Sequence, residues 1–203
     1  MLVTASSEPL HCMTCNVHAG SRTYRHDEIR DCFVRLLRKI YPHNMITTEA
    51  LVGKTMPNAH GVAKEVFSDV TLVLGAETLI IDFAVVCPGG ANYLQYPTRS
   101  AITQDGAALH KEVSKRRHFA TVAPPHTPPP NSVIPFVLEA SGRLGPSALG
   151  FLHRICPTQT YLRTRFLHDV SFICARTTGR ILRTSRDRER RLPLNGGQVP
   201  ILG

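Results

Sequence analysis

Residues 67–86 read FSDVTLVLGAETLIIDFAVV, two runs of β-branched and aromatic residues on either side of a Gly75-Ala76 turn. This pattern predicts a hairpin of two well-buried strands. One aspartate lies in each arm, Asp69 in the first and Asp82 in the second. Aspartate is depleted in strands and is rarely buried unless it is paired or bound to a metal. The hairpin therefore predicts two carboxylates that converge on one cation; the alternative is that one caps a strand end and the other faces solvent.

The segments around this hairpin predict one α/β domain, a mixed central sheet flanked by helices. The expected order is a helix at 27–41, a short strand at 45–48, the hairpin, a helix at 101–119, an extended proline-rich connector at 123–130, a strand at 133–139, and helices at 146–155 and 160–184. The domain organisation that follows is a disordered start at 1–10, a zinc-knuckle-like loop at 11–26, a core at 27–156, a basic helix at 157–185 and a tail at 186–203.

The charge of the chain is unevenly distributed. Its 203 residues carry 24 Lys and Arg against 15 Asp and Glu, a net charge of +9. Residues 154–191 hold ten arginines and three acids, net +7, whereas residues 42–99 hold three bases and five acids, net −2. An acidic centre beside a basic end suits a metal-dependent enzyme that acts on a polyanion. A solvated basic tail with no partner is the alternative.

Two classes of protein are disfavoured by the sequence. No stretch approaches the ~20 apolar residues of a membrane-spanning helix, because Asp82 interrupts the most hydrophobic run. Residues 1–10 lack the basic and apolar regions of a signal peptide. The six cysteines are scattered, which argues against a secreted disulfide framework and for a reducing, intracellular compartment.

Possible zinc ligands are dense near the N-terminus. Cys12 and Cys15 form a CxxC pair, followed by His26 after ten residues and by Cys32 after five more. Structural zinc takes four nitrogen or sulfur ligands, and a CxxC turn supplies two of them. The sequence therefore predicts a structural Zn²⁺ on these four residues. Cys32 also fits the apolar face of the first helix, and two further histidines are rival fourth ligands: His11 and His18.

A second set of residues suits phosphodiester cleavage with Mg²⁺ or Mn²⁺. Such chemistry needs carboxylates to hold the cation and a positive group to stabilise developing charge. Asp69 and Asp82 are the expected metal ligands. Glu49 and Glu139, each at a strand edge, either complete the shell of the ion or face solvent. Lys115 either reaches the site from the second helix or belongs to a solvated basic run.

Several of these segments together resemble one family. They are the CxxC pair, Arg25-His26-Asp27, Glu49, Ser68-Asp69-Val70, Asp82, the run KRRHF at 115–119, and the block FVLEASGRLGP at 136–146. Across roughly residues 12–155 their order resembles the restriction-enzyme-like endonuclease domain of non-LTR retrotransposons, which lies downstream of a reverse transcriptase. The resemblance implies a PD-(D/E)xK core, metal-dependent nicking of target DNA and a neighbouring zinc knuckle.

The resemblance assigns roles residue by residue. Asp69 takes the place of the first acid, Asp82 that of the second, and Lys115 matches a lysine of the helix. Two positions depart from the family pattern: residues 67–68 are Phe-Ser in place of Arg/Lys-Pro, and Ala84 stands where the motif lysine is expected. In the helix, residues 118–119 are His-Phe where the family usually has Lys-Tyr. Lys115 then has to substitute for the missing lysine.

The function expected from the sequence is that of a retroelement DNA endonuclease domain, nuclear, with DNA and possibly element RNA as partners. The alternative is a catalytically inactive nucleic-acid-binding remnant or domesticated module of the same fold. A reverse transcriptase does not fit within 203 residues, so the chain is expected to be a fragment, a remnant or a domain kept for another use.

Overall fold

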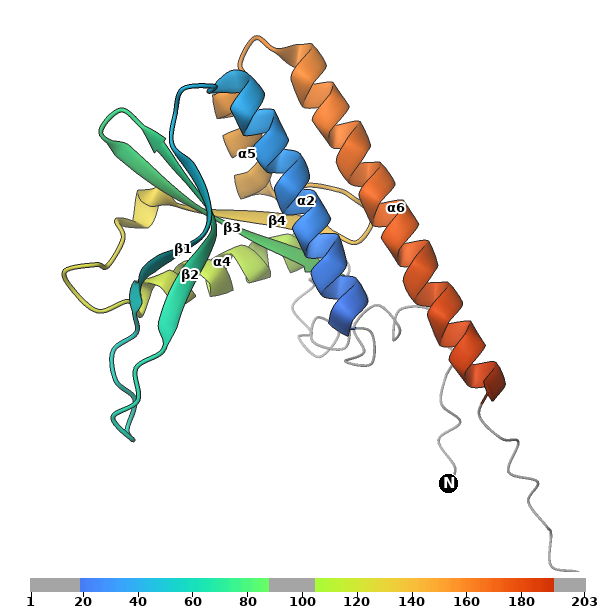
Figure 1. The fold of residues 1–203 in the computed structure, drawn as a ribbon, viewed down its shortest axis with the longest axis horizontal. Helices are drawn as coiled ribbons and strands as arrows, with labels where there is room; N and C mark the ends of the chain where they lie inside the picture. The colour runs from blue at the N-terminus through green and yellow to red at the C-terminus, as the bar shows by residue number, and fades with distance from the viewer. Residues whose placement is uncertain (1–18, 88–104, 192–203) are drawn as a thin grey trace, which may run out of the picture.

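The computed structural model describes residues 19–87 and 105–191 (Figure 1). Its elements are α2 (Ala19–Ile40), β1 (Ile46–Lys54), β2 (Glu65–Leu74), β3 (Glu77–Val86), α4 (Gly106–Ala120), the 3-10 turn η2 (Pro130–Ser132), β4 (Val133–Glu139), α5 (Pro146–Ile155) and α6 (Thr160–Arg191). The described chain thus has the predicted α/β organisation.

The four strands form one mixed sheet in the order β1-β2-β3-β4. Neighbours β1, β2 and β3 are antiparallel, and short turns suffice to connect them. Strand β4 runs parallel to β3 and therefore needs a crossover, which contains α4. The predicted mixed sheet is confirmed.

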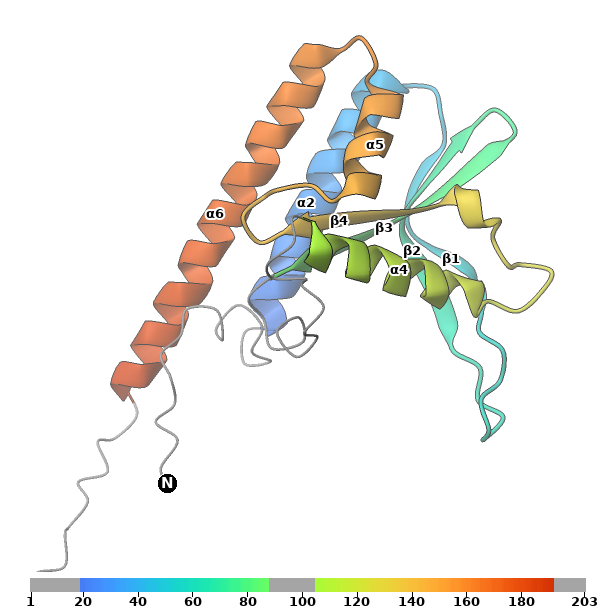
Figure 2. The same cartoon turned by 180° about the vertical axis from the view of Figure 1, so that it is seen from behind.

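Helices cover both faces of the sheet (Figures 1 and 2). The main core lies on the face covered by α2, α5 and α6, where the ring of Phe33 contacts those of Phe83, Phe136 and Phe166 at centroid distances of 5.5, 4.7 and 5.6 Å. Helix α4 lies on the opposite face, which Figure 2 shows in front. Residues that alternate along β3 and β4 therefore face different helices, because successive side chains of a strand point to opposite sides.

The sheet forks in the middle of its central strand pair. Strand β2 pairs with β3 only over Val70–Leu74, opposite Glu77–Ile81. On the other side of Val70, β2 pairs with β1 alone, and beyond Ile81, β3 pairs with β4 alone. The two predicted acids are the first residues inside this fork, Asp69 on β2 and Asp82 on β3.

Several element boundaries differ from the sequence prediction. Helix α4 begins at Gly106, where the sequence predicted a helix from 101, and Asp105 precedes it as the N-cap residue. Residues 19–26, expected to lie in a zinc-knuckle-like loop, are the first two turns of α2. Their polar side chains gain tertiary partners there, which a count of apolar residues does not reveal. Helix α6 continues to Arg191, past the expected tail boundary at 185, and β1 spans nine residues where a short strand was expected. The expected disordered start, most of the zinc-knuckle loop and residues 192–203 lie outside the described residues.

The block at 136–146, which carries much of the family resemblance, comprises the end of β4, a tight turn and the first residue of α5. Arg143 donates two hydrogen bonds to the carboxylate of Glu139, at 2.7 and 3.1 Å. Gly142 has a φ of +93°, and a Cβ there would lie 3.0 Å from the Cα of Ser171 on α6. Glycine is required because the backbone is left-handed and α6 approaches it closely.

The start of α5 is held by a buried acid of α4. Glu112 is 3% exposed, and its Oε1 accepts the Ser147 N–H at 2.9 Å. A carboxylate at this point satisfies an unpaired amide at the helix N-terminus. A Cβ on Gly145 would lie 2.8 Å from Glu112 Oε1 and 3.0 Å from Ala108 Cβ. The close approach of α4 therefore leaves no room for a side chain at Gly145, directly before the first residue of α5.

Gly145→Ala is predicted to lower the free energy of unfolding by about 1–3 kcal/mol, because the added methyl group displaces Glu112 from the helix end. Gly150→Ala, in the same helix, is the matched control. Nothing lies within 4 Å of a Cβ at Gly150, so better helix propensity should stabilise that variant by about 1 kcal/mol. Urea unfolding of the two variants beside the wild type measures both effects. Equal stability of the two variants would contradict this packing.

Candidate active site

Asp69 and Asp82 meet in the fork of the sheet. Their positions continue the register of the β2–β3 pair, whose last partners on this side are Val70 and Ile81. In place of a backbone bond between the strands, Asp69 Oδ2 accepts the Phe83 N–H at 2.5 Å. The carboxylates of Asp69 and Asp82 lie close enough for each to shift the pKa of the other. The structure thus brings together the two acids that the sequence predicted to converge.

The pKa values of the two acids are shifted in opposite directions. Burial, reinforced by the charge of Asp69, raises the pKa of Asp82 from its ordinary 3.8 to about 6, against the lowering effect of Lys115. Burial also acts to raise the pKa of Asp69, but the hydrogen bond and charge of His26 outweigh it and hold that pKa below 3.8. Two carboxylates in contact cannot both ionise freely, so the pair shares a proton in mildly acidic solution.

Lys115 reaches the pair from α4. Its Nζ lies 2.7 Å from Asp82 Oδ2, an ion pair in which the lysine side chain is 21% exposed and the aspartate side chain 8%. The angles of this contact fall outside hydrogen-bond geometry, so Asp82 Oδ2 is buried with a charged neighbour but no directed donor. Lys115 and Ala84 also line the same cavity. The ammonium group is therefore present beside the position where the family motif has a lysine.

His26 reaches Asp69 from α2, the helix on the other face. Its Nε2 lies 3.1 Å from Asp69 Oδ2, and its Nδ1 lies 3.2 Å from Asp27 Oδ1. The hydrogen bond to Asp69 raises the pKa of His26, although burial opposes this. The sequence predicted His26 as a zinc ligand and not as a partner of Asp69. The signal was present, because His26 precedes Ile29 and Phe33 by three and seven residues, the spacing of one helix face.

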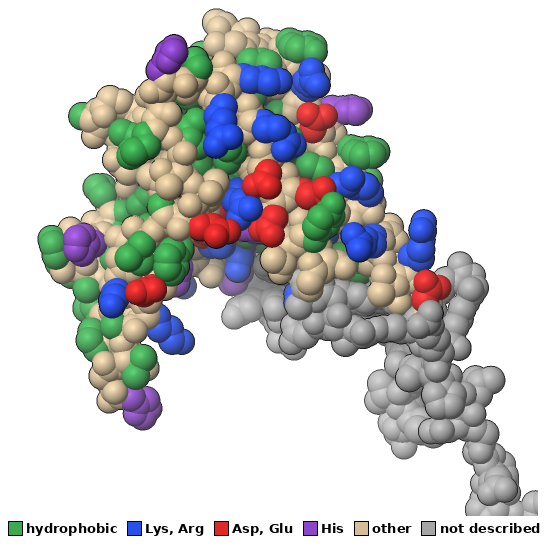
Figure 3. Space-filling model, viewed as in Figure 1, with side chains coloured by type: hydrophobic (Ala, Val, Ile, Leu, Met, Phe, Trp, Pro, Cys, Tyr) green, Lys and Arg blue, Asp and Glu red, His purple; other side chains and the backbone are tan. Residues whose placement is uncertain are grey.

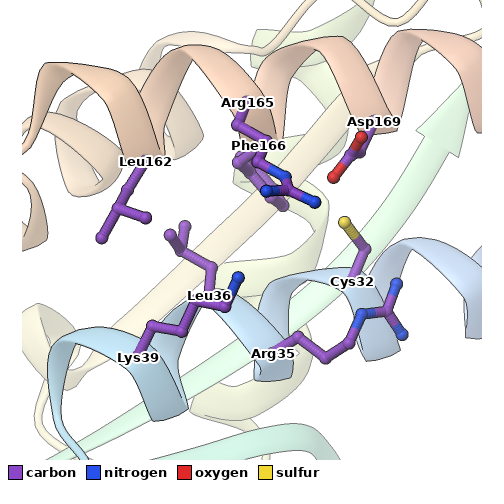
Figure 4. Close-up of a pocket in the computed structure, with 8 residues that line it drawn as sticks. All are labelled: Cys32, Arg35, Leu36, Lys39, Leu162, Arg165, Phe166 and Asp169. Atoms are coloured by element: carbon purple, nitrogen blue, oxygen red, sulfur yellow. The ribbon is translucent and has the colours of Figure 1, made fainter.

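The structure does not bring the two described zinc candidates together. His26 and Cys32 are six residues apart on α2, a rotation of about 240°, so they face different sides of the helix. Cys32 lies in the core between α2 and α6, beside Phe166 and Asp169 (Figure 4). Cys32 therefore has the core position that was its alternative. The remaining zinc candidates lie outside the described residues: His11, Cys12, Cys15 and His18.

Glu49 lies at the rim of the site and not in it. It falls between the register pairs Thr48↔Val70 and Ala50↔Ser68, opposite Asp69, but its φ of +52° departs from strand geometry. Its side chain is 72% exposed and pairs with Arg30, Oε1 to Nη1 at 2.7 Å. Arg30 also contacts Asp27 at 3.4 Å, so Glu49 is connected to His26 only through two other side chains. Figure 3 shows acidic side chains gathered around basic ones on this face.

The expectation that Glu139 completes the shell of the ion, or else faces solvent, is wrong on both counts. On β4, Pro135 is the partner of Asp82, and Glu139 lies four residues further along, about 13 Å away. Glu139 is 8% exposed and engaged by Arg143. Its role is to close the β4–α5 turn.

A hard divalent cation fits the fork. Among the described residues Asp82 Oδ2 is a buried oxygen without a directed donor, and burial raises the pKa of Asp82 although the charge of Lys115 lowers it. Among the described residues no group of three His, Cys, Asp or Glu side chains is placed to hold a metal. Mg²⁺, however, is commonly bound by one or two carboxylates together with waters and substrate phosphates. Asp69 and Asp82 meet that requirement.

Two arginines of the basic C-terminal helix contact α2. Arg176 on α6 forms an ion pair with Glu28 on α2, and Arg180 lies over the ring of Tyr24 at 5.5 Å. These two side chains hold α6 against α2. Arg183 is exposed, and its expected contact with nucleic acid remains a prediction.

Comparison with known proteins gives no assignment: no family model matches the chain, and no curated protein matches it. Within residues 19–87 and 105–191, no helix has the length and apolar character needed to cross a bilayer. The function therefore has to be argued from the site.

The Asp82 carboxyl is predicted to titrate with a midpoint near pH 6 in a ¹³C NMR experiment. Lys115→Met should raise that midpoint, because the ammonium favours the ionised form, and Asp69→Asn should lower it, because the neighbouring charge opposes ionisation. Because the pKa is higher in the folded than in the unfolded protein, the stability that Asp82 contributes is complete below about pH 4 and is lost as the pH rises through about 6. A midpoint near 4 that neither variant moves would contradict the arrangement.

Proposed function

We propose that this protein is a metal-dependent endonuclease domain that nicks DNA, with Mg²⁺ or Mn²⁺ held by Asp69 and Asp82. The observation that carries the proposal is the fork of the sheet, where the carboxylates of Asp69 and Asp82 are near enough to shift each other's pKa and the Lys115 Nζ lies 2.7 Å from Asp82. The order of helix, three strands, helix and strand is the order on which the resemblance to a PD-(D/E)xK core rests. It supports a restriction-endonuclease-like fold.

Asp69 and Asp82 have different roles in the proposed metal site, because their pKa values differ. Asp69, with its lowered pKa, supplies a permanent negative charge, and His26 and the Phe83 N–H fix the position of its Oδ2. Asp82 gives up its proton near pH 6 and becomes the second ligand. A cation bound between them would activate a water molecule and neutralise the scissile phosphate.

Lys115 replaces the motif lysine that is expected at position 84, where this chain has alanine. Its ammonium group lies beside Asp82, which would let it stabilise negative charge on a phosphate bound at the carboxylate pair. Because Lys115 comes from α4, on the face opposite α2, the site is enclosed by a positive group on each side: His26 when protonated and Lys115.

A second candidate is a catalytically silent nucleic-acid-binding module. The ion pairs of the site also support this candidate. His26 pairs with Asp69 and Lys115 pairs with Asp82, so the two carboxylates have positive partners without a metal. Under either proposal the partner is DNA, with element RNA as a further ligand, and the protein acts in the nucleus. The structural Zn²⁺ also remains part of the proposal, with Cys12 and Cys15 as its ligands.

Asp69→Asn and Asp82→Asn are each predicted to reduce nicking at least about 100-fold, because each removes a negative charge from the metal site. Lys115→Met should reduce it by about the same factor if that lysine replaces the one missing at Ala84. Asp169→Asn, the same change on α6 away from the fork, is the control. The measurement is conversion of supercoiled plasmid to open circle with Mg²⁺ or Mn²⁺, beside DNA binding in EDTA.

Two results would decide against this proposal. Equal nicking by the wild type and Asp82→Asn would show that the fork does not hold the catalytic cation. DNA binding without any nicking by the wild type, in either metal, would favour the silent module.

A further inference from the structure

A cavity of about 410 Å³ lies next to the fork, at the end of β3 and between α2 and α4. Its lining residues come from these three elements: Arg22, Thr23, Arg25, His26, Ala84, Val85, Lys111 and Lys115. Five of the eight side chains are basic, and none is acidic. His26 and Lys115 belong both to this cavity and to the carboxylate pair, so the two sites are contiguous.

Arg25 is the unusual member of this set. It is 3% exposed, and among the residues that the structure describes its Nε and Nη1 are buried without a hydrogen-bond partner. The thiols of Cys174 and Cys87 are described groups that favour the charge of Arg25. Burial raises the pKa of Cys174, so that thiol stays neutral. A buried guanidinium without an anion destabilises the folded protein, as any unpaired buried ion does. Arg25 is therefore a donor group that lacks its acceptor.

The rest of the cavity adds positive charge. Burial lowers the pKa of Lys111, and the neighbouring Lys115 lowers it further. Asp82 partly offsets this effect, but its carboxylate already pairs with Lys115 at 2.7 Å. The described residues thus provide the lysines with one nearby carboxylate and Arg25 with none.

We infer that this cavity binds a phosphate group, with Arg25 as the buried anchor and Lys111 and Lys115 at its sides. A guanidinium matches the geometry of phosphate oxygens and offers several donors, two of which are unused here. The inference deepens the proposed function and rests on it for the source of the phosphate, which is a nucleic-acid strand.

The position of the cavity makes it a second phosphate site. Ala84 lies two residues beyond Asp82 on β3, a distance of about 6–7 Å along the strand. A phosphate against Arg25 is therefore distinct from one at the carboxylate pair. The strand would be held at two points, which fixes its direction through the fork.

The first test uses inorganic phosphate as the probe and the full chain in EDTA, so that no cutting can occur. Phosphate should raise the thermal unfolding midpoint of the wild type relative to chloride at equal ionic strength, because it binds the folded protein. In Arg25→Met this difference should disappear, and without phosphate the variant should be at least as stable as the wild type, since a buried charge has been replaced by an apolar group. Arg38→Met, an exposed arginine of the same helix, should behave as the wild type does.

The second test distinguishes a terminal phosphate of a nucleic-acid strand from an internal one. Single-stranded oligonucleotides with a 5′-phosphate and with a 5′-hydroxyl are compared in EDTA. A terminal phosphate predicts tighter binding of the 5′-phosphorylated strand by at least tenfold, lost in Arg25→Met. An internal phosphate predicts equal binding of both strands, weakened about tenfold by Arg25→Met and not by Arg38→Met. No stabilisation of the wild type by phosphate, or unchanged binding by Arg25→Met in both assays, would overturn the inference. Because neither assay involves cleavage, these outcomes are independent of the nicking experiment.

Discussion

The separation of β2 from β3 beyond the pair Val70–Ile81 is the constraint on which the rest of the structure depends. Where two strands part, their backbone groups lose ladder partners, and such groups must be satisfied in another way. Asp69 does this by accepting the Phe83 N–H. The opening also lets side chains from both faces of the sheet reach the same point. His26 from α2 and Lys115 from α4 can therefore act on one carboxylate pair, which an unbroken sheet would prevent.

The helices around the fork are fixed by contacts that are largely independent of the site. Phe33 anchors α2 to the sheet through Phe83 and Phe136, and Glu112 anchors α4 to the start of α5. Because these anchors lie a few residues from His26 and Lys115 respectively, the charged side chains extend from rigid segments. Such support is what keeps catalytic geometry within narrow limits.

Much of this fold could be predicted from periodicity and from glycine and proline signals. The strand at 133–139 and the helix at 146–155 have the expected bounds, because their apolar patterns are regular and proline marks a boundary. The start of α2 could not be predicted in this way. Residues 19–26 are mostly polar, and partners distant in sequence hold this end of α2 in place. Asp69 contacts His26, and Arg176 forms an ion pair with Glu28 in the next turn. For the candidate site, spacing indicated Asp69, Asp82 and Lys115. It misassigned Glu139 because the turn that buries this acid is formed by residues that follow it.

The central claim is that the fork holds one divalent cation between Asp69 and Asp82. The most direct measurement is paramagnetic broadening of backbone amide signals as Mn²⁺ is added to the protein without DNA. The account predicts that broadening begins at Asp69, Asp82 and Phe83, extends to Lys115, and is absent from the Asp69→Asn/Asp82→Asn double variant. Broadening that starts elsewhere, or that persists unchanged at the fork in the double variant, would contradict it.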